Sequence, residues 1–418
     1  MASLFNPATP RWRAAAAVGV IGVLAVAAVL TIFLPTAQPT QDLPSGITPQ
    51  EYRDAERRFV RLQHRPATPD DVLMLLGELA SQAGDYRRAS DCFHTIPVDH
   101  PQYGPAARFQ EAEALLRQER ATAAETAIRQ FLTAPSHTTK DATQLQVRAH
   151  QWLTYLLSVQ LRFDERRQVL RAQSLLRPLD VHETSWLHFP MLVIWNTPAA
   201  WNRLQNYRQR EPDDLPLQIA EARYLTANGR LEEAWEQLTD LHGRYASNRE
   251  CAAAILECSY DRGDWRAFAA LHAEIPSFES GEPTLLTLMR GHGAMHAGHW
   301  ATAIGHFEQV LVADPSHPAA HAGIARSRPH VDGTTEAEAS LEALQALSEI
   351  RLELARAAVE DVEAINRIAR LSEQLGLSQA ATDYRALAVR ITSHPQSQQS
   401  RFAPREAAPL TSSSASER

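Results

Sequence analysis

A histidine-rich segment is the part of this sequence whose residue types could most directly support chemistry. Six of the 17 histidines in the 418-residue chain lie between positions 292 and 321. His292 and His296 are four residues apart, so a helix would place them on one face, where two imidazoles can bind a divalent metal. A hydrolytic His-Glu-x-x-His helix also needs a glutamate as general base, and Gly293 stands in that position. We therefore expect scattered surface histidines, and the alternative is a metal-binding or metal-dependent protein that uses the segment His292–His321.

No other pattern typical of an enzyme is present. The chain has no glycine-rich phosphate loop, no Gly-x-Ser-x-Gly turn and no Cys-x-x-Cys pair. Of its three cysteines, Cys251 and Cys258 are seven residues apart, which in one helix separates their Cα atoms by about 10 Å, beyond the reach of a disulfide. The sequence predicts a non-enzymatic protein with no catalytic residues, no cofactor and no resident metal.

Regularly spaced glycines indicate repeated helical hairpins. Each of four glycines precedes a small or apolar residue by five positions, and the last three glycines are 34 and 35 residues apart. Glycine adopts the left-handed backbone that a tight turn requires, and a period of this length is typical of helical-hairpin solenoids. The four pairs are Gly84 with Ala89, Gly229 with Ala234, Gly263 with Phe268, and Gly298 with Ala303.

Two segments carry the hairpin pattern in full, and they resemble the tetratricopeptide repeat (TPR) family. The resemblance implies an all-α solenoid of TPR-type helical hairpins, coiled as a right-handed superhelix, that acts as a scaffold for protein–protein interaction. A protein or peptide partner would bind in its concave groove. The first segment reads Gly77, Gly84-Asp85-Tyr86, Ala89, Phe93, Ile96 and Pro101, and the second reads Gly291, Gly298-His299-Trp300, Ala303, Phe307, Val310 and Pro315.

The resemblance covers residues 48–328 and becomes degenerate between residues 137 and 214. Within the degenerate stretch we expect one hairpin around Trp152 to Leu170. A second hairpin should run from Trp186 to Tyr207, because Thr197-Pro198 is a typical start for its second helix.

The chain beyond the repeats divides into two parts. Residues 336–390 carry apolar residues at spacings of three and four, which predicts a helical C-terminal block that caps the solenoid. Residues 391–418 are rich in serine, glutamine and proline, so we expect them to be disordered.

The resemblance to TPR proteins also implies which residues face the concave groove. These are the residues six and two positions before each turn glycine, and here they include an acidic pair and the histidine pair. The acidic pair would favour a cationic partner segment, and protonation of the histidines between about pH 7.5 and 5.5 would weaken its binding. A merely solvated inner face is the alternative. The predicted groove residues are Glu78, Gln82, Arg223, Glu257, Asp261, His292 and His296.

An apolar run near the N-terminus predicts a membrane anchor. Residues 14–34 carry no charge over 21 positions, a length that spans about 30 Å as a helix and matches the hydrocarbon thickness of a bilayer. Two arginines precede the run, and the first charge after it is Asp42, so the positive-inside rule places residues 1–13 in the cytoplasm. We expect one transmembrane helix in the bacterial cytoplasmic (inner) membrane, a linker at 35–47, and repeats on the periplasmic side. A cleaved signal peptide is the alternative, and it would also export the repeats.

The charge balance of the chain narrows the expected partners. The formal net charge is −8 at pH 7, and neutralising phosphates requires a cationic face. We therefore expect a protein or peptide partner and the membrane, and no nucleic acid.

Overall fold

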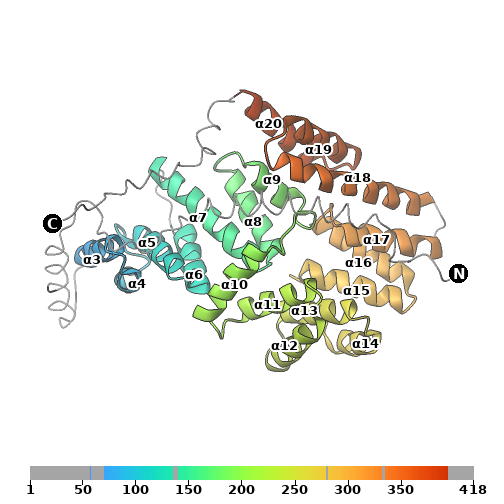
Figure 1. Ribbon diagram of the computed structural model, residues 1–418, viewed down its shortest axis with the longest axis horizontal. Coiled ribbons are helices and arrows are strands. Elements are labelled where there is room, and N and C mark those ends of the chain that lie inside the picture. Colours follow the sequence, from blue (N-terminus) through green and yellow to red (C-terminus); the bar gives the residue numbers. More distant parts are fainter. Residues whose placement is uncertain (1–56, 58–69, 135–139, 279–280, 332–334, 394–418) are drawn as a thin grey trace, which may run out of the picture.

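The computed structural model describes residues 57, 70–134, 140–278, 281–331 and 335–393, and within these ranges every regular element is a helix. Figure 1 shows the helices following a curved path from α3, through α7 to α10 in the middle, to α14 and back up to α20. The predicted all-helical repeat solenoid is confirmed. In chain order the elements are α3 (Asp70–Gln82), α4 (Tyr86–Thr95), α5 (Gly104–Arg117), α6 (Ala121–Thr133), α7 (Lys140–Val159), α8 (Phe163–Ser174), α9 (Val181–His188), α10 (Pro198–Arg210), α11 (Leu215–Ala227), α12 (Leu231–Arg244), α13 (Arg249–Asp261), α14 (Trp265–Glu274), α15 (Thr284–His296), α16 (Trp300–Ala313), α17 (Pro318–Ser327), the 3₁₀ turn η1 (Arg328–His330), α18 (Thr335–Ala357), α19 (Val362–Gln374) and α20 (Ser378–Ser393).

Consecutive helices pack as hairpins whose turns share one backbone geometry. The four turn glycines identified from the sequence all have positive φ, between 68° and 78°. The α5–α6 turn has no glycine, yet Glu119 takes the same left-handed conformation at φ 60°, and Leu161 does so in the α7–α8 turn at φ 58°. A side chain is strained in this region, so packing of the two helices must impose the turn at these positions.

In two hairpins, a phenylalanine ring of the second helix packs directly against a glycine of the first helix. A Cβ atom added to Gly77 would lie 2.5 Å from the Phe93 ring, and one added to Gly291 would lie 2.6 Å from the Phe307 ring. Gly323 of the following hairpin meets the opposite edge of the Phe307 ring, where a Cβ would also overlap it. Phe93 and Phe307 are fully buried. The distance between the packed helices in these hairpins therefore depends on a phenylalanine ring that lies against glycines.

The degenerate region forms one of the two predicted hairpins. Helices α7 and α8 pack together as expected, and Thr197 caps α10 by accepting a hydrogen bond from the Ala200 backbone at 3.2 Å. The second predicted hairpin is wrong, because α9 packs against α8 and α20 whereas α10 packs against α7 and α11. The connection between them diverges because Phe189 is buried in the apolar cluster of the C-terminal helices.

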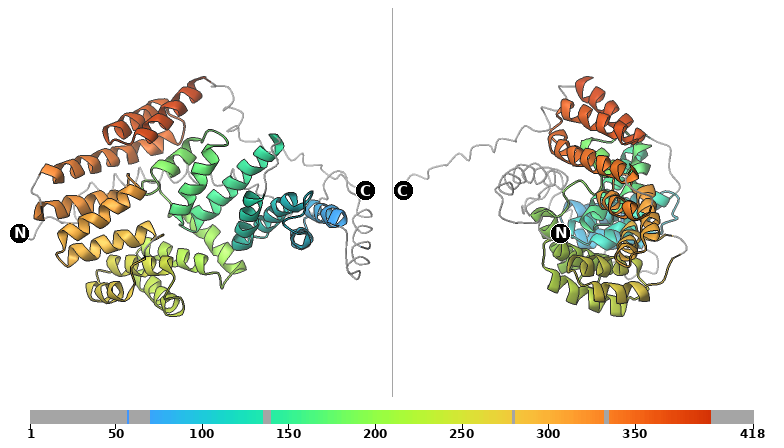
Figure 2. Two further views of the ribbon diagram at one scale, coloured as in Figure 1. Left: turned by 180° about the vertical axis from the view of Figure 1, so that it is seen from behind. Right: turned by 90° about the vertical axis from the view of Figure 1, so that its right-hand side faces the viewer.

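The C-terminal block both caps the array and returns to its middle. Helix α18 packs on α17, and α20 lies against α9. Figure 1 and the view from behind in Figure 2 show the C-terminal helices lying over the middle of the array. The Ser185 and Tyr384 hydroxyls are 2.9 Å apart, and His188 Nε2 lies 2.7 Å from an Asp383 carboxylate oxygen. Residues almost 200 positions apart in the sequence are thus in direct contact.

A carboxylate of α8 caps a helix that begins 120 residues later. The residue before α15 is Pro283, whose side chain cannot accept a hydrogen bond, and it provides no side-chain cap. Asp164 takes this role by accepting hydrogen bonds from the Thr284 backbone N–H at 3.0 Å and from the Thr284 hydroxyl at 2.9 Å. Capping of α15 is therefore a tertiary contact that ties it to the α8–α9 segment, which we define as residues 163–188.

The loop after α16 is tied to the same segment. The Arg167 guanidinium donates to the Ala313 carbonyl, and the Ser316 hydroxyl donates to the His188 carbonyl at 2.9 Å. Arg167 also donates to the Leu187 carbonyl at 3.0 Å within the segment. The α8–α9 segment thereby holds α15, the loop before α17, and α20 around itself.

Several sequence-based expectations lie outside the described residues. These are the cytoplasmic N-terminus (1–13), the transmembrane segment (14–34), the linker (35–47), the opening of the array (48–69 apart from residue 57) and residues 394–418 of the tail. The tail was expected to begin at residue 391, but residues 391–393 belong to helix α20, where Ile391 is buried. Within the described part of the chain, no helix combines the length and the apolar character needed to cross a bilayer.

Substitution of Gly291 tests the ring-on-glycine packing, and Gly305 on the adjacent helix supplies a matched control. Gly291→Ala would push a methyl group into the buried Phe307 ring, an overpacking that costs about 1–3 kcal/mol and exceeds the gain of about 1 kcal/mol in helix propensity. A Cβ at Gly305 meets open space, so Gly305→Ala should stabilise. We expect thermal unfolding to give a lower Tm for the first variant and a higher Tm for the second. Equal Tm increases for both would contradict this packing.

Candidate functional site

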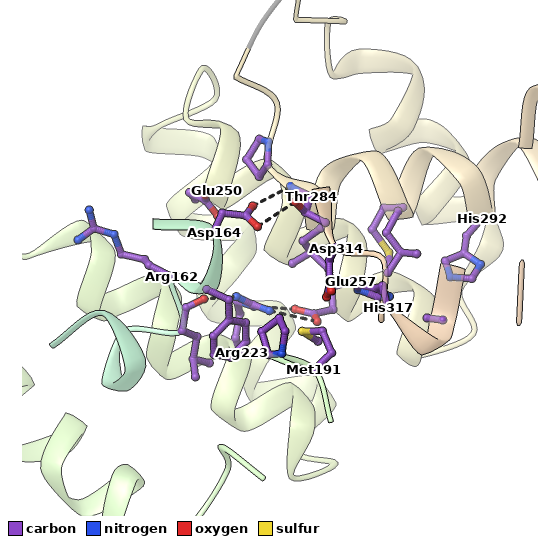
Figure 3. A pocket seen from close by; sticks show the side chains of 18 of the residues that line it. Arg162, Asp164, Met191, Arg223, Glu250, Glu257, Thr284, His292, Asp314 and His317 are labelled. Carbon is purple, nitrogen blue, oxygen red and sulfur yellow. Dashed lines mark hydrogen bonds and ion pairs between the residues drawn. The ribbon is translucent and has the colours of Figure 1, made fainter. Parts of the chain in front are cut away.

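First helices of successive hairpins line one cavity of about 340 Å³. Helices α11, α13, α15 and α17 provide most of the wall, and α8 together with residues 190–191 closes it (Figure 3). The contacts of the α8–α9 segment thus add a wall to the concave surface and make it a cavity that is partly open to solvent. Its lining combines charged side chains with apolar ones that include Met191, Leu288 and Met289.

An ion pair between neighbouring hairpins crosses the cavity wall. Arg223 of α11 donates from Nε to Glu257 of α13 at 2.8 Å and from Nη1 to the Leu161 carbonyl at 3.0 Å. Only 8% of the Arg223 side chain is exposed. Burial opposes the charge, but the Glu257 carboxylate holds the pKa of Arg223 above its usual value. The pair is internally compensated, so it positions α11 against α13 and leaves little charge for a ligand.

Two further carboxylates of α13 stand at the cavity rim without such compensation. Solvent reaches the side chains of Glu250 and Asp261, and neither accepts a hydrogen bond from the described side chains. Partial burial at the cavity wall, and then the adjacent Glu257 carboxylate, raise the pKa of Asp261 to about 6. Burial also raises the pKa of Glu250, against the effect of Arg223. The two groups lie at opposite ends of α13, so a cation beside either one would relieve that group.

The floor of the cavity consists of buried polar side chains. His292, Asp314 and His317 are 5%, 2% and 4% exposed. The His292 ring packs against Tyr260 with a centroid distance of 4.4 Å. Burial, followed by the charges of Arg326 and His317, lowers the pKa of His292 to about 4, and burial lowers the pKa of His317 as well. Both imidazoles are therefore neutral at pH 7.

Of the seven predicted groove residues, the structure brings four together. Glu78 and Gln82 lie on α3 at one end of the array (Figure 1), away from the cavity, whose lining comes from α8 and from the hairpins that begin with α11. His296 is not part of the lining, and its ring stacks on Trp265 with centroids 4.0 Å apart. The four that line the cavity are Arg223, Glu257, Asp261 and His292.

The remaining polar lining comes from positions that the repeat pattern does not mark. Asp164 belongs to the degenerate region, and Asp314 and His317 belong to the loop and cap that precede α17. The density of histidines between residues 292 and 321 was a signal for His317. Glu250 could have been found too, because it lies two helical turns before Glu257 on the same face of α13.

The histidine-rich segment does not provide a metal centre in the described residues. Within them, no three His, Cys, Asp or Glu side chains converge as metal ligands. His292 faces the cavity while His296 stacks on Trp265, so the four-residue spacing does not produce a shared site. The expected titration of His292 between about pH 5.5 and 7.5 is also wrong, because its pKa lies near 4. Asp261 is the cavity group whose pKa moves toward that range.

Comparison with known proteins finds similarity in fold. No family model matches the sequence, and no curated protein does. Among solved structures, the human IFIT1 dimer with m7Gppp-AAAA is 13% identical, with 84% of this chain and 97% of that chain covered at a TM-score of 0.35. A tetratricopeptide repeat protein from Parabacteroides merdae is 11% identical, with coverages of 62% and 98% and a TM-score of 0.31. Yeast Tom70 is 10% identical, with coverages of 85% and 96% and a TM-score of 0.30.

We expected no nucleic-acid partner on the basis of the net charge, and excluding this class of partner was wrong. A similar helical array, that of human IFIT1, is solved with the capped RNA m7Gppp-AAAA. The physical reason is that net charge describes the whole chain, whereas binding depends on local charge, and four arginines line the cavity of this chain. The hairpin turns and the ring-on-glycine contacts are those of an all-helical array of repeated hairpins.

Proposed function

We propose that this protein is a non-enzymatic interaction scaffold that binds a short segment of a protein or peptide partner in its cavity. The observation that supports this proposal is the convergence of four successive first helices, α11, α13, α15 and α17, on one partly open cavity of about 340 Å³. Ligand sites generally occupy about 300–1,000 Å³. A cavity at the small end of this range accommodates one or two residues of a partner and excludes a folded domain.

The charges of the lining favour a cationic segment. Six carboxylates line the cavity against four guanidinium groups. Arg223 is already paired with Glu257, and Arg162 with Glu165, so the rim carboxylates Glu250 and Asp261 carry the excess negative charge. A positively charged residue of the partner beside either carboxylate would compensate it without displacing an existing ion pair.

The proposal includes attachment of the scaffold to the bacterial cytoplasmic membrane. It is supported by the sequence of residues 14–34, whose length and lack of charge suit one transmembrane helix, and by the arginines that precede it. Residues 35–47 would then separate the array from the bilayer on the periplasmic side. In this arrangement the cavity is presented to partners outside the cytoplasm.

Site-specific crosslinking in intact membranes tests the cavity as the binding site. A photoreactive benzoyl-phenylalanine at Tyr260, which lines the cavity, should crosslink the partner. The same residue at Trp235, an aromatic on α12 outside the cavity, is the matched control and should not. The double variant Glu250→Gln and Asp261→Asn should reduce the yield from Tyr260 because the excess negative charge is removed, whereas Glu236→Gln on the surface of α12 should leave it unchanged.

Two outcomes would contradict the proposal. Equal crosslinking from both aromatic positions would show that the partner does not bind in the cavity. An unchanged yield in the double rim variant, with unchanged Tm, would remove the electrostatic basis for a cationic partner.

The pH dependence of partner binding follows from Asp261. Its pKa of about 6 means that it gains a proton and loses its charge as the pH falls through that value, so affinity for a cation is present above pH 6 and declines below it. Since solvent reaches this side chain, we expect a modest change of roughly two- to fivefold in Kd, centred at or below pH 6. Titration of the captured partner by fluorescence anisotropy should show this change in the wild type and a smaller one in Asp261→Asn. A steeper pH dependence in the variant would assign the effect to another group.

The membrane arrangement predicts an uncleaved anchor with exported repeats. N-terminal sequencing of the protein from membranes should find the start of the chain, and a periplasm-dependent reporter fused after residue 48 should be active. A mature N-terminus near Gln38 would establish the signal-peptide alternative, and a reporter active only in the cytoplasm would overturn the orientation.

A further inference from the structure

One cation of the cavity lining is unpaired within the part of the chain that the structure describes. Four guanidinium groups line the cavity, and three of them are engaged. Arg162 and Arg223 form ion pairs, and Arg167 donates to two backbone carbonyls. Arg326 of α17 is exposed, and no group in the described residues accepts a hydrogen bond from it. An uncompensated positive charge therefore lies in a lining that is acidic overall.

The charges of Asp261 and Arg326 flank His292 of α15, the helix that packs on both α13 and α17. The His292 ring contacts Tyr260, the neighbour of Asp261 on α13. Burial, and then the charge of Arg326 on α17, lower the pKa of His292. The pKa of Asp261 is instead raised, by burial and then by Glu257, an effect that a guanidinium in contact would oppose. His292 thus separates an unpaired negative charge from an unpaired positive one.

The cavity lining next to His292 is apolar. Leu288 and Met289 belong to the preceding turn of α15, and Ala322 lies one turn before Arg326 on α17. Ala322 is only half-buried, so part of this apolar surface is accessible to a ligand. An apolar side chain that entered here would leave water, and the flexible methionine would adapt to its shape.

The spacing of the helices sets the spacing of the charges that a partner must carry. Packed helices lie about 8–10 Å apart, so α13 and α17, which both pack on α15, are up to about 20 Å apart. Four residues of an extended segment rise about 13 Å, and residues i, i+2 and i+4 point to one face. Long side chains at i and i+4 make up the remaining distance. A helical segment rises only about 6 Å over the same four residues and is too short.

We propose that the cavity binds an extended segment of the partner that carries a basic and an acidic residue four positions apart, with an apolar residue midway between them. This inference rests on the proposed function. The basic residue pairs with Asp261 and the acidic residue with Arg326, while the apolar side chain enters the cavity beside Leu288 and Met289. The segment therefore crosses α13, α15 and α17. A purely cationic segment would leave Arg326 unpaired, so a segment with both charges binds more tightly.

Calorimetry of the full-length chain in detergent with defined pentapeptides tests this inference. The reference peptide is lysine–serine–leucine–serine–glutamate, acetylated and amidated so that neither end is charged. One comparison peptide has glutamine in place of glutamate, and a second has glutamine in place of lysine. A third, serine–lysine–leucine–glutamate–serine, keeps the composition but brings the charges two positions apart. We expect each comparison peptide to bind about two- to fivefold more weakly than the reference, the range of one solvent-exposed ion pair.

Two variants assign each preference to its residue. Arg326→Gln should abolish the preference for glutamate over glutamine and keep the preference for lysine, and Asp261→Asn should do the reverse. Arg266→Gln removes another exposed guanidinium, on α14 outside the cavity, and as the matched control it should change neither preference. Misfolding would lower the Tm and weaken all peptides together, so the selective losses distinguish a binding role from a structural one.

Three results would overturn the inference. Equal binding of the glutamate and glutamine peptides to the wild type would remove the acidic position. Equal binding of the two charge spacings would remove the extended segment of defined length. Absence of measurable binding by every peptide would remove the site for such a segment altogether.

The outcomes separate this inference from the proposed function. If the peptides fail in any of these ways while the rim variant still lowers partner crosslinking, the scaffold proposal stands and the paired-charge segment falls. If the peptides bind as expected while crosslinking is equal from Tyr260 and Trp235, the peptide site stands and the scaffold proposal falls.

Discussion

The attachment of the α8–α9 segment to three distant parts of the chain is the constraint on which the rest of the structure depends. Asp164 caps α15, Arg167 and His188 hold the loop after α16, and Ser185 contacts Tyr384 of α20. A hairpin array without these contacts would present an open concave surface, because each repeat otherwise touches only its neighbours. Closing loops of more than a hundred residues carries an entropic cost that grows slowly with length, so a few specific contacts and one apolar cluster suffice.

The same segment sets the electrostatics of the cavity. Arg166 is buried beside the rings of Phe163 and Trp186, with its guanidinium carbon 4.7 and 5.5 Å from their centroids. Burial, and then the neighbouring Arg167, lower its pKa to about 9. Two guanidinium groups behind the floor moderate the charge of Asp314, while the rim on α13 remains acidic. The cavity is therefore acidic at its rim on α13, and its floor consists of buried polar side chains.

The repeat could be predicted from the sequence because its determinants are local. Gly77 and Phe93, or Gly291 and Phe307, are 16 residues apart, and a turn glycine marks most of the hairpins, so the residues that define a hairpin lie within one period. The four cavity residues found in advance, Arg223, Glu257, Asp261 and His292, all belong to hairpins marked by a turn glycine.

The closure of the array could not be predicted, because its determinants are distant in sequence. In the sequence, Asp164 is an ordinary acidic residue in the first turn of α8. Only the fold shows that it caps another helix. The prediction that the helices α9 and α10 form one hairpin was wrong for the same reason. Phe189 joins a cluster formed by the C-terminal helices, which no local pattern between residues 137 and 214 reveals. Asp314 and His317 lie at the cavity floor because contacts with the α8–α9 segment hold the loop after α16 there.

A distance measurement across the closure tests this account most directly. Spin labels at Leu175, at the end of α8, and at Val389, on α20, would replace side chains that are 87% and 66% exposed, and the three native cysteines are buried. Arg390 donates to the Leu179 carbonyl, so both positions flank the contact between the two segments. Double electron–electron resonance should give one narrow, short distance distribution for the full-length protein. A broad distribution extending to the separations of an open array would contradict the closed cavity.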